Sequence, residues 1–177
     1  KGIYIDVGCH HPLINNNTYL LYKRGWSGIN IDLDFSSIDM FNYFRPNDFN
    51  HKIALTSKKG ESDLFFFHNR APKNTLNKAN GKGAKLVKKI KTDTLDNIIK
   101  HSKLSIKEID FLSIDVEGNE LEVLKGFNIK KYNPKVVVLE FINKNTKSFY
   151  EQNINNIKKY LIYKYMVKNN YRLSNWI

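Results

Sequence analysis

The sequence predicts an α/β protein: a Rossmann-like, mostly parallel β-sheet with helices on both faces. Two observations predict this class. Short apolar runs alternate with helix-like segments, and these runs are nearly continuous in apolar residues, as in strands that are buried on both faces. The chain has 177 residues, so we expect a single domain over residues 1–177. It starts and stops at strand-like segments, which predicts that terminal elements of the fold lie outside it.

The first half of the chain is predicted to contain strand–helix units and then a hairpin. Strands are expected where short apolar runs end at a glycine or a polar residue, at 3–7, 28–32 and 53–55. Helices are expected at 18–24, which Gly25 ends, and at 36–44, which Pro46 closes. The Lys59-Gly60 turn predicts that residues 63–67 pair back on the third strand.

The second half begins with an expected loop at 71–84, which is rich in Asn, Lys and Gly. The alternation of strands and helices then continues. Helices are expected at 94–101, 120–125 and 153–169, and Gly126 ends the second of them. Apolar strands are expected at 109–116 and 136–141, and a last strand at 171–173.

Positive charge is concentrated in one part of the chain. The net charge is +12, yet residues 1–55 carry as many basic as acidic side chains. The densest part is 70–91, which contains no acid and whose basic residues are Arg70, Lys73, Lys78, Lys82, Lys85, Lys88, Lys89 and Lys91. Such a field attracts phosphates, nucleotide-linked sugars, acidic glycans or nucleic acid, so we expect an anionic acceptor. The alternative is a solvated lysine-rich surface.

Two features bear on location. No apolar run approaches the roughly 20 residues of a membrane span, and no signal segment opens the chain. Cys9 is the one cysteine, which excludes an internal disulfide and suits a reducing compartment. A cytoplasmic location is therefore expected.

Polar residues stand where the expected strands end, at the edge where parallel sheets bind ligands. Gly8 would let the backbone turn tightly beside a cofactor, and Asp32 would accept hydrogen bonds from both hydroxyls of a ribose. An ordinary strand–loop–helix turn is the alternative. Further along, Asp115 and Glu117 bracket a strand end, and Glu140 lies in an apolar strand, where an unpaired carboxylate is costly. These three acids either form ion pairs or hold a divalent cation such as Mg²⁺.

Two long motifs are distinctive. The first is Tyr4-Ile5-Asp6-Val7-Gly8-Cys9-His10-His11-Pro12 with Gly25-Trp26-Ser27-Gly28-Ile29-Asn30-Ile31-Asp32, and the second is Ile109-Asp110-Phe111-Leu112-Ser113-Ile114-Asp115-Val116-Glu117-Gly118-Asn119-Glu120. Together they resemble the FkbM family of methyltransferases, over most of residues 2–142. The resemblance implies a class I methyltransferase fold, S-adenosylmethionine as methyl donor and O-methylation, commonly of sugars or secondary metabolites.

The resemblance also implies roles for matching positions. Asp6, Gly8 and the adjoining Cys9 would lie against the methionine part of the cofactor, Asp32 would bind its ribose, and Ala54 and Leu55 would lie beside its adenine. His10-His11-Pro12 replaces the further glycines of the usual methyltransferase loop.

An acceptor hydroxyl must also lose its proton, and two sets of bases are candidates. Asp115 and Glu117 are the first, because they lie at the expected ligand-binding edge of the sheet. His10 and His11 are the second, and a loop-capping role is the alternative for them.

Three functions are compatible with these observations. The first is O-methylation of a sugar, glycan or related small molecule. The second is methylation of nucleic acid through the basic residues 70–91, although no Asn-Pro-Pro-Tyr-like sequence follows the strand at 109–116. The third is a nucleotide- or nucleic-acid-binding module without catalysis.

Overall fold

The computed structural model describes residues 1–177 except 70, 72, 103, 141–153 and 176–177. The chain divides into two compact units, Lys1–Glu140 and Phe141–Ile177. No helix among the described residues has the length and apolar character that crossing a membrane requires. The prediction of one domain over the whole chain stays a prediction.

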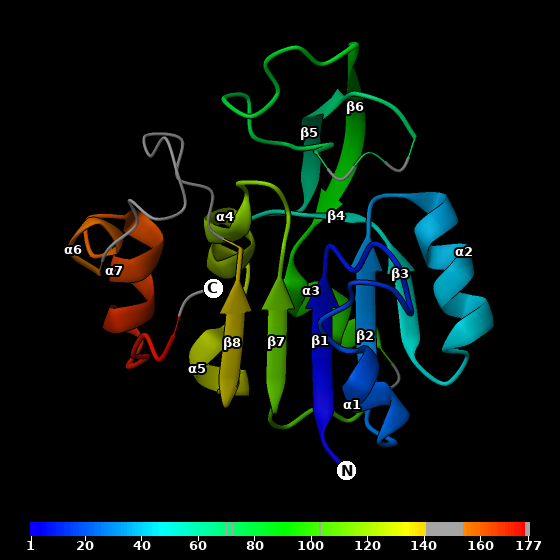
Figure 1. The fold of residues 1–177 in the computed structure, drawn as a ribbon, viewed down its shortest axis with the longest axis vertical. Coiled ribbons are helices and arrows are strands. Elements are labelled where there is room, and N and C mark those ends of the chain that lie inside the picture. Colours follow the sequence, from blue (N-terminus) through cyan, green and yellow to red (C-terminus); the bar gives the residue numbers. More distant parts are fainter. Residues whose placement is uncertain (70, 72, 103, 141–153, 176–177) are drawn as a thin grey trace. The chain divides into compact units, whose positions relative to one another are not determined.

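The first unit contains a five-stranded, all-parallel sheet in the order β3-β2-β1-β7-β8, whose arrows all point the same way in Figure 1. Its strands are β1 (Ile3–Val7), β2 (Ser27–Asp32), β3 (Phe49–Lys52), β7 (Phe111–Ile114) and β8 (Val136–Leu139). The helices of this unit are α1 (Tyr19–Lys23), α2 (Phe35–Phe44), α3 (Leu95–His101), α4 (Glu120–Lys125) and α5 (Ile129–Tyr132). The predicted α/β class with a parallel, Rossmann-like sheet is confirmed.

The core explains why the central strands read as continuous apolar runs. Ile5, Ile29, Leu112 and Ile114 have no exposed surface, and α2 adds Phe41. Because strands in the middle of a covered sheet bury both faces, successive residues are apolar instead of alternating with polar ones. Each such side chain contributes roughly 1.5–3 kcal/mol by its burial.

The register of the sheet sets the positions of the site residues. Val7 pairs with Ile31 on one side and with Ile114 on the other, and Ile114 pairs with Leu139. The residues that follow these four are Gly8, Asp32, Asp115 and Glu140. One row along the carboxyl edge of the sheet therefore carries a glycine and three acids, beside the point between β1 and β7 where the strand order reverses.

A second, three-stranded sheet corrects part of the prediction. Its order is β4 (Ala54–Leu55), β6 (Leu86–Asp93) and β5 (Gly60–Phe66). The expected strand at 53–55 is thus no part of the parallel sheet, and β3 stands there instead. β5 pairs with β6 rather than with residues 53–55, so the predicted hairpin partner was wrong.

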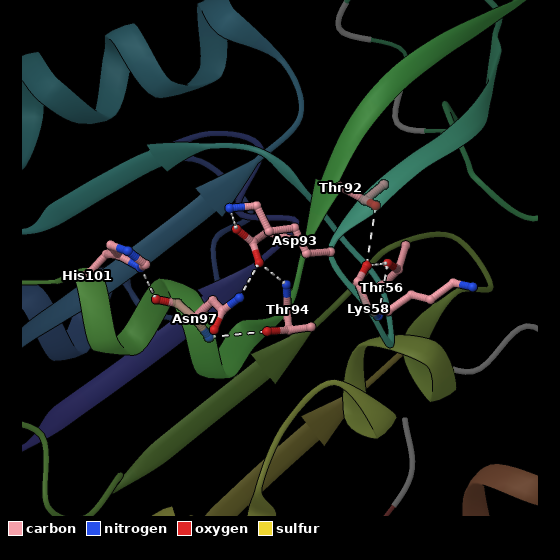
Figure 2. Close-up of polar contacts among 8 residues, drawn as sticks. Thr56, Lys58, Thr92, Asp93, Thr94, Asn97 and His101 are labelled. Carbon is pink, nitrogen blue, oxygen red and sulfur yellow. Dashed lines mark hydrogen bonds and ion pairs between the residues drawn. The ribbon is translucent and has the colours of Figure 1, made fainter.

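The junction of β6 and α3 is held by side-chain caps (Figure 2). Thr94 Oγ1 accepts from the N–H of Asn97, as an N-cap does. Asp93 Oδ1 accepts from the backbone N–H of Thr94 at 2.7 Å and from Asn97 Nδ2 at 2.9 Å. The helix start predicted at residue 94 is therefore correct to one residue, and this polar cluster is structural.

The second unit contains α6 (Ile154–Ile157) and α7 (Leu161–Lys168). The predicted helix at 153–169 is divided, because Tyr160 adopts an extended conformation between them. Residues 171–173 form no strand in the described part of the chain, contrary to the prediction. The strand predicted at 136–141 is observed as β8, and residue 141 lies outside the described residues. Residue 153, the predicted start of the helix at 153–169, also lies outside them.

Candidate active site

An open cleft lies at the carboxyl edge of the parallel sheet, beside the reversal of strand order. Segments that follow β1, β2 and β7 line it, together with β4 and the loop after β5. The predicted site residues that line it are Asp6, Gly8, Cys9, His10, Asp32, Ala54, Leu55, Asp115 and Glu117. His11 and Glu140 are not among the lining residues.

Gly8 is required by the approach of two strand ends. Its φ is +78°, and an ideal Cβ there would lie 1.7 Å from the backbone oxygen of Asp115. The N–H groups of Gly8 and Cys9 both donate to the carbonyl of Ile31, at 2.8 and 3.2 Å. The glycine thus lets the loop after β1 close against β7 and β2, whereas the sequence suggested only room for a cofactor.

Asp32 holds two loops and still has acceptor capacity. Its Oδ2 accepts from the N–H of His10 at 2.9 Å, and its Oδ1 accepts from the N–H of Asp34 at 2.8 Å. Burial raises the pKa of Asp32, and these two bonds oppose that shift. A carboxylate offers about four lone-pair sites, so each oxygen can accept one more hydrogen bond from a ligand in the cleft.

Asp6 is buried at 2% exposure and is oriented by the loop after β1. Its Oδ2 accepts from Thr18 Oγ1 at 2.8 Å and from Asn16 Nδ2 at 3.0 Å. Burial raises the pKa of Asp6 to about 6, against the effect of those bonds and of Arg45. The bonds from Thr18 and Asn16 and the nearby Arg45 thus favour the ionised carboxylate against burial.

Arg45 is a buried charge that the sequence analysis missed. Its guanidinium donates to Thr18 Oγ1 at 2.8 Å, to Asn16 Oδ1 at 2.7 Å and to the carbonyl of Pro12, and it lies 4.8 Å from the centre of the Phe41 ring. Removing such a partner from buried polar groups costs several kcal/mol. Because Arg45 engages the oxygen of Asn16, the amide nitrogen of Asn16 is left to face Asp6. No pattern in the sequence indicated that Arg45 would be buried and hydrogen-bonded in this way.

Cys9 lies in the buried cluster with Ile38 and Phe41. Burial raises the pKa of its thiol well above the ordinary range, so the thiol stays protonated. It lines the cleft as an apolar group rather than as a nucleophile.

Three acids meet at the ends of β7 and β8. One carboxylate oxygen from each of Asp115, Glu117 and Glu140 lies within 4.8 Å of the others. Burial, repulsion from Asp115 and a hydrogen bond with Asp115 raise the pKa of Glu140 to about 8. Burial also raises the pKa of Glu117, with Asp115 and Glu120 adding to the shift. Carboxylates whose pKa lies closer to neutrality suit proton transfer.

Ion pairing, one of the two alternatives for Glu140, does not occur among the described residues, where its Oε2 is buried without a hydrogen-bond partner. The spacing of the three carboxylates is compatible with a hard cation. A Mg²⁺ site at Asp115, Glu117 and Glu140 stays a prediction.

The two histidines have different surroundings. His10 is exposed, has a φ of +50° and lines the cleft. His11 Nδ1 accepts from the N–H groups of Leu13 and Ile14, both at 3.1 Å. These bonds cap the loop, which is the alternative role given above for the histidines. They require that Nδ1 carries no proton.

The basic segment is partly neutralised in space. Lys88, Lys89 and Lys91 lie on β6, where Lys89 Nζ is 2.8 Å from Asp63 Oδ1 of β5. Lys88 Nζ lies 3.8 Å from the centre of the Phe66 ring. Acids absent from residues 70–91 are therefore supplied by the neighbouring strand, which local sequence could not reveal.

Comparison with known proteins places the cleft in a family context. The family model described as the Methyltransferase FkbM domain matches residues 6–173. The matched range begins at Asp6 and contains every cleft residue named above. No curated protein and no solved structure matches the chain.

Proposed function

The chain belongs to the FkbM methyltransferase family, and from this premise we propose that it is an S-adenosylmethionine-dependent O-methyltransferase acting on a sugar, glycan or related small-molecule hydroxyl. One observation carries the proposal: the cleft has acids suited to the cofactor on β1 and β2 and acids suited to proton transfer after β7. A methyl donor and an acceptor must meet in one cleft. This arrangement provides groups that can bind the donor and groups that can take the proton of the acceptor.

The donor set fits S-adenosylmethionine. Ribose hydroxyls are hydrogen-bond donors, and each oxygen of Asp32 has a lone pair beyond its bond to the backbone. The α-ammonium of the methionine part needs an anionic acceptor. Asp6 can serve, because it lines the same cleft from β1, the strand that pairs with β2, which ends at Asp32. Ala54 and Leu55 are buried and apolar, which suits the face of an adenine. When bound, the cofactor supplies a methyl group already activated on a sulfonium.

The remaining task of the protein is to align the acceptor oxygen and remove its proton. We assign the proton to Glu117 or Asp115. The acceptor oxygen would bond the methyl carbon as the bond from that carbon to sulfur breaks, with the electron pair staying on sulfur as a neutral thioether. The O–H bond of the acceptor breaks as well, and its proton moves to a carboxylate oxygen. Burial and the neighbouring Asp115 raise the pKa of Glu140, so Glu140 holds its proton to a higher pH than an ordinary glutamate does, and it shares a hydrogen bond with Asp115. It can thereby orient Asp115.

The acceptor is proposed to be anionic, such as a nucleotide sugar or an acidic glycan. Exposed lysines on β6 and the loop before it support this choice, since they attract phosphate or carboxylate groups. The proposed location is the cytoplasm, in keeping with a single, buried and free cysteine.

The test is transfer of label from methyl-labelled S-adenosylmethionine to a panel of nucleotide sugars, capsule-type glycans and random RNA. We expect label on a carbohydrate, and much less label with at least one of the variants Asp115→Asn and Glu117→Gln. Label on RNA alone would make the protein a nucleic-acid methyltransferase. Binding of the donor without any transfer would make it a non-catalytic module.

A further inference from the structure

The turn that carries Glu117 has an unusual backbone. Glu117 has a φ of +57° and Gly118 a φ of +94°, so both residues lie in the left-handed region. That region is unfavourable for a non-glycine residue because its Cβ lies too close to the following carbonyl oxygen. A glutamate stays there only when its surroundings over-determine the conformation, and such residues concentrate at functional sites.

Side chains from the loop between β5 and β6 hold this turn by its carbonyls. Thr75 Oγ1 and Asn80 Nδ2 donate to the carbonyl of Glu117, at 2.8 and 2.6 Å. Asn77 Nδ2 donates to the carbonyl of Gly118 at 2.6 Å. We call Thr75, Asn77 and Asn80 the carbonyl clamp.

Glu120 holds the same turn by its N–H groups. Its Oε1 accepts from the N–H groups of Val116 and Gly118, at 3.2 and 2.9 Å. Donors and acceptors of the turn are thus both engaged: its N–H groups by a residue of the same segment, and its carbonyls by the clamp, about 40 residues away in sequence.

The clamp is itself anchored to a strand edge. The backbones of Thr75 and Phe65 exchange two hydrogen bonds, at 2.9 and 3.3 Å. Asn74 Oδ1 accepts from the N–H of Phe67, and Asn74 Nδ2 donates to the carbonyl of His68, both at 2.9 Å. Asn74 and Thr75 are buried, at 7% and 1% exposure. The loop is therefore a built support rather than a surface that meets the turn by chance.

Close packing links the clamp to the glycine. An ideal Cβ on Gly118 would lie 2.3 Å from Asn80 Nδ2. A side chain at position 118 would displace Asn80 as well as strain the backbone. Gly118 is thus required by the clamp in addition to its φ.

We propose that Thr75, Asn77 and Asn80 are positioning residues that hold the Glu117 carboxylate against Asp115 in the cleft. Returning Glu117 to the ordinary φ region would redirect its Cα–Cβ bond and carry the carboxylate away from Asp115 and Glu140. The inference rests on the proposed function, because it assumes that Glu117 acts on the acceptor.

The first test compares Asn77→Ala/Asn80→Ala with the matched control Asn69→Ala, an exposed asparagine of the same connection. Turnover of the accepted nucleotide sugar should fall roughly 10–100-fold in the double variant, the cost of misplacing a catalytic group by about 1 Å. The affinity for S-adenosylmethionine, measured by calorimetry, should change less than about twofold. Normal turnover, or an equal loss of donor affinity, would overturn the proposal.

A double-mutant cycle separates positioning from general structural support. In a Glu117→Gln background the Asn80→Ala change should lower turnover by less than about twofold, because the group that it positions is already gone. Full additivity of the two losses would contradict the proposal.

A second readout does not depend on the chemistry. The φ of Glu117, obtained from its HN–Hα and HN–Cβ scalar couplings together, should leave the left-handed region in the double variant and stay there in Asn69→Ala. If Glu117→Gln alone keeps full turnover, Glu117 is not the base and the proposed mechanism fails. The coupling then still decides whether the clamp holds the turn.

Discussion

Two charged regions of this protein contrast. The acidic edge, made of Asp6, Asp32, Asp115, Glu117 and Glu140, lies at the ends of the parallel strands. Burial there raises the pKa of Asp6, Asp32, Glu117 and Glu140. The basic hairpin, made of β5, β6 and Lys85 directly before β6, carries exposed lysines at Lys85 and on β6. There a hydrogen bond with Asp63, and not burial, raises the pKa of Lys89.

The contrast teaches that the number of charged residues in a stretch of sequence says little about how strongly those charges interact in the folded protein. The hairpin carries many charges, but water and neighbouring acids screen them. The acidic edge carries few, but desolvation makes each interaction strong. We therefore expect substitutions at the edge to have large effects and those on the hairpin small ones.

The largest effect is expected from removing charge at the end of β7. Asp115→Asn and Glu117→Gln keep the shape of the side chain, so fold and donor binding should persist. Methyl transfer should fall roughly 10²–10⁴-fold in at least one of them, the usual worth of a positioned proton acceptor. A labelled-donor assay measures this, with and without a chelator. Loss on chelation and rescue by Mg²⁺ would assign the acids to a cation, and normal rates in both variants would direct attention to His10.

The next effect concerns donor affinity. Asp32→Asn keeps an acceptor oxygen but loses the charge, and hydrogen bonds to charged groups contribute roughly 1.5–3 kcal/mol each. We expect S-adenosylmethionine to bind about 10–100-fold more weakly by calorimetric titration. Asp39→Asn, at an exposed position on α2, is the control and should bind the donor normally. Unchanged affinity of Asp32→Asn would remove Asp32 from the cofactor site.

A third effect is on stability and depends on pH. Glu140 has its pKa raised from 4.5 to about 8 in the folded state, so the folded protein binds a proton that the unfolded chain has released. Stability therefore falls as pH rises from about 4.5 to about 8. Glu140→Gln removes that fall and should raise Tm at pH 8 relative to wild type by about 2–4 °C, which corresponds to roughly 1 kcal/mol.

The same comparison at pH 5 should give a much smaller difference. Thermal denaturation at the two pH values, with Glu108→Gln as an exposed control, checks this expectation. Equal Tm differences at both pH values would show that Glu140 titrates normally.

The smallest effect is expected from the basic hairpin. Lys85, Lys88 and Lys89 are exposed, and reversing their charge should raise KM for an anionic acceptor only about two- to fivefold at low salt, with donor affinity unchanged. Screening should abolish the difference at high salt. The control reverses charge at the equally exposed Lys100, Lys107 and Lys130. A normal KM at low salt would show that the hairpin is only a solvated surface. A 100-fold rise in KM would show that the hairpin matters as much as the acidic edge, contrary to the comparison above.

Most of the parallel sheet was predictable because its strands are locally apolar. β1, β2, β7 and β8 all fall within predicted strands or one residue from them. β3 was missed because its sequence, Phe49-Asn50-His51-Lys52, is polar for a strand and its residues are only partly buried. β6 was missed because it is exposed on both faces along most of its length, so lysines occupy positions where an apolar pattern would otherwise appear.

The residues of the candidate site also divide into those that the sequence indicated and those that it did not. The acidic ends of the expected strands pointed to Asp32, Asp115 and Glu117, and the family resemblance pointed to Asp6. All four line the cleft. Arg45 and the carbonyl clamp gave no signal, because arginine and asparagine are ordinary on surfaces and in loops. Their roles depend on which groups they meet.

The sequence by itself determined the α/β class, the family and the acids at the ends of the strands, because those depend on apolar periodicity and on short motifs. Only the tertiary structure decided that the clamp meets the carbonyls of Glu117 and Gly118, that Arg45 is buried beside Asn16, and that Asp63 neutralises Lys89. These contacts join residues far apart in the chain. Their strength is set by burial and hydrogen-bond geometry, and neither is encoded in any local stretch of residues.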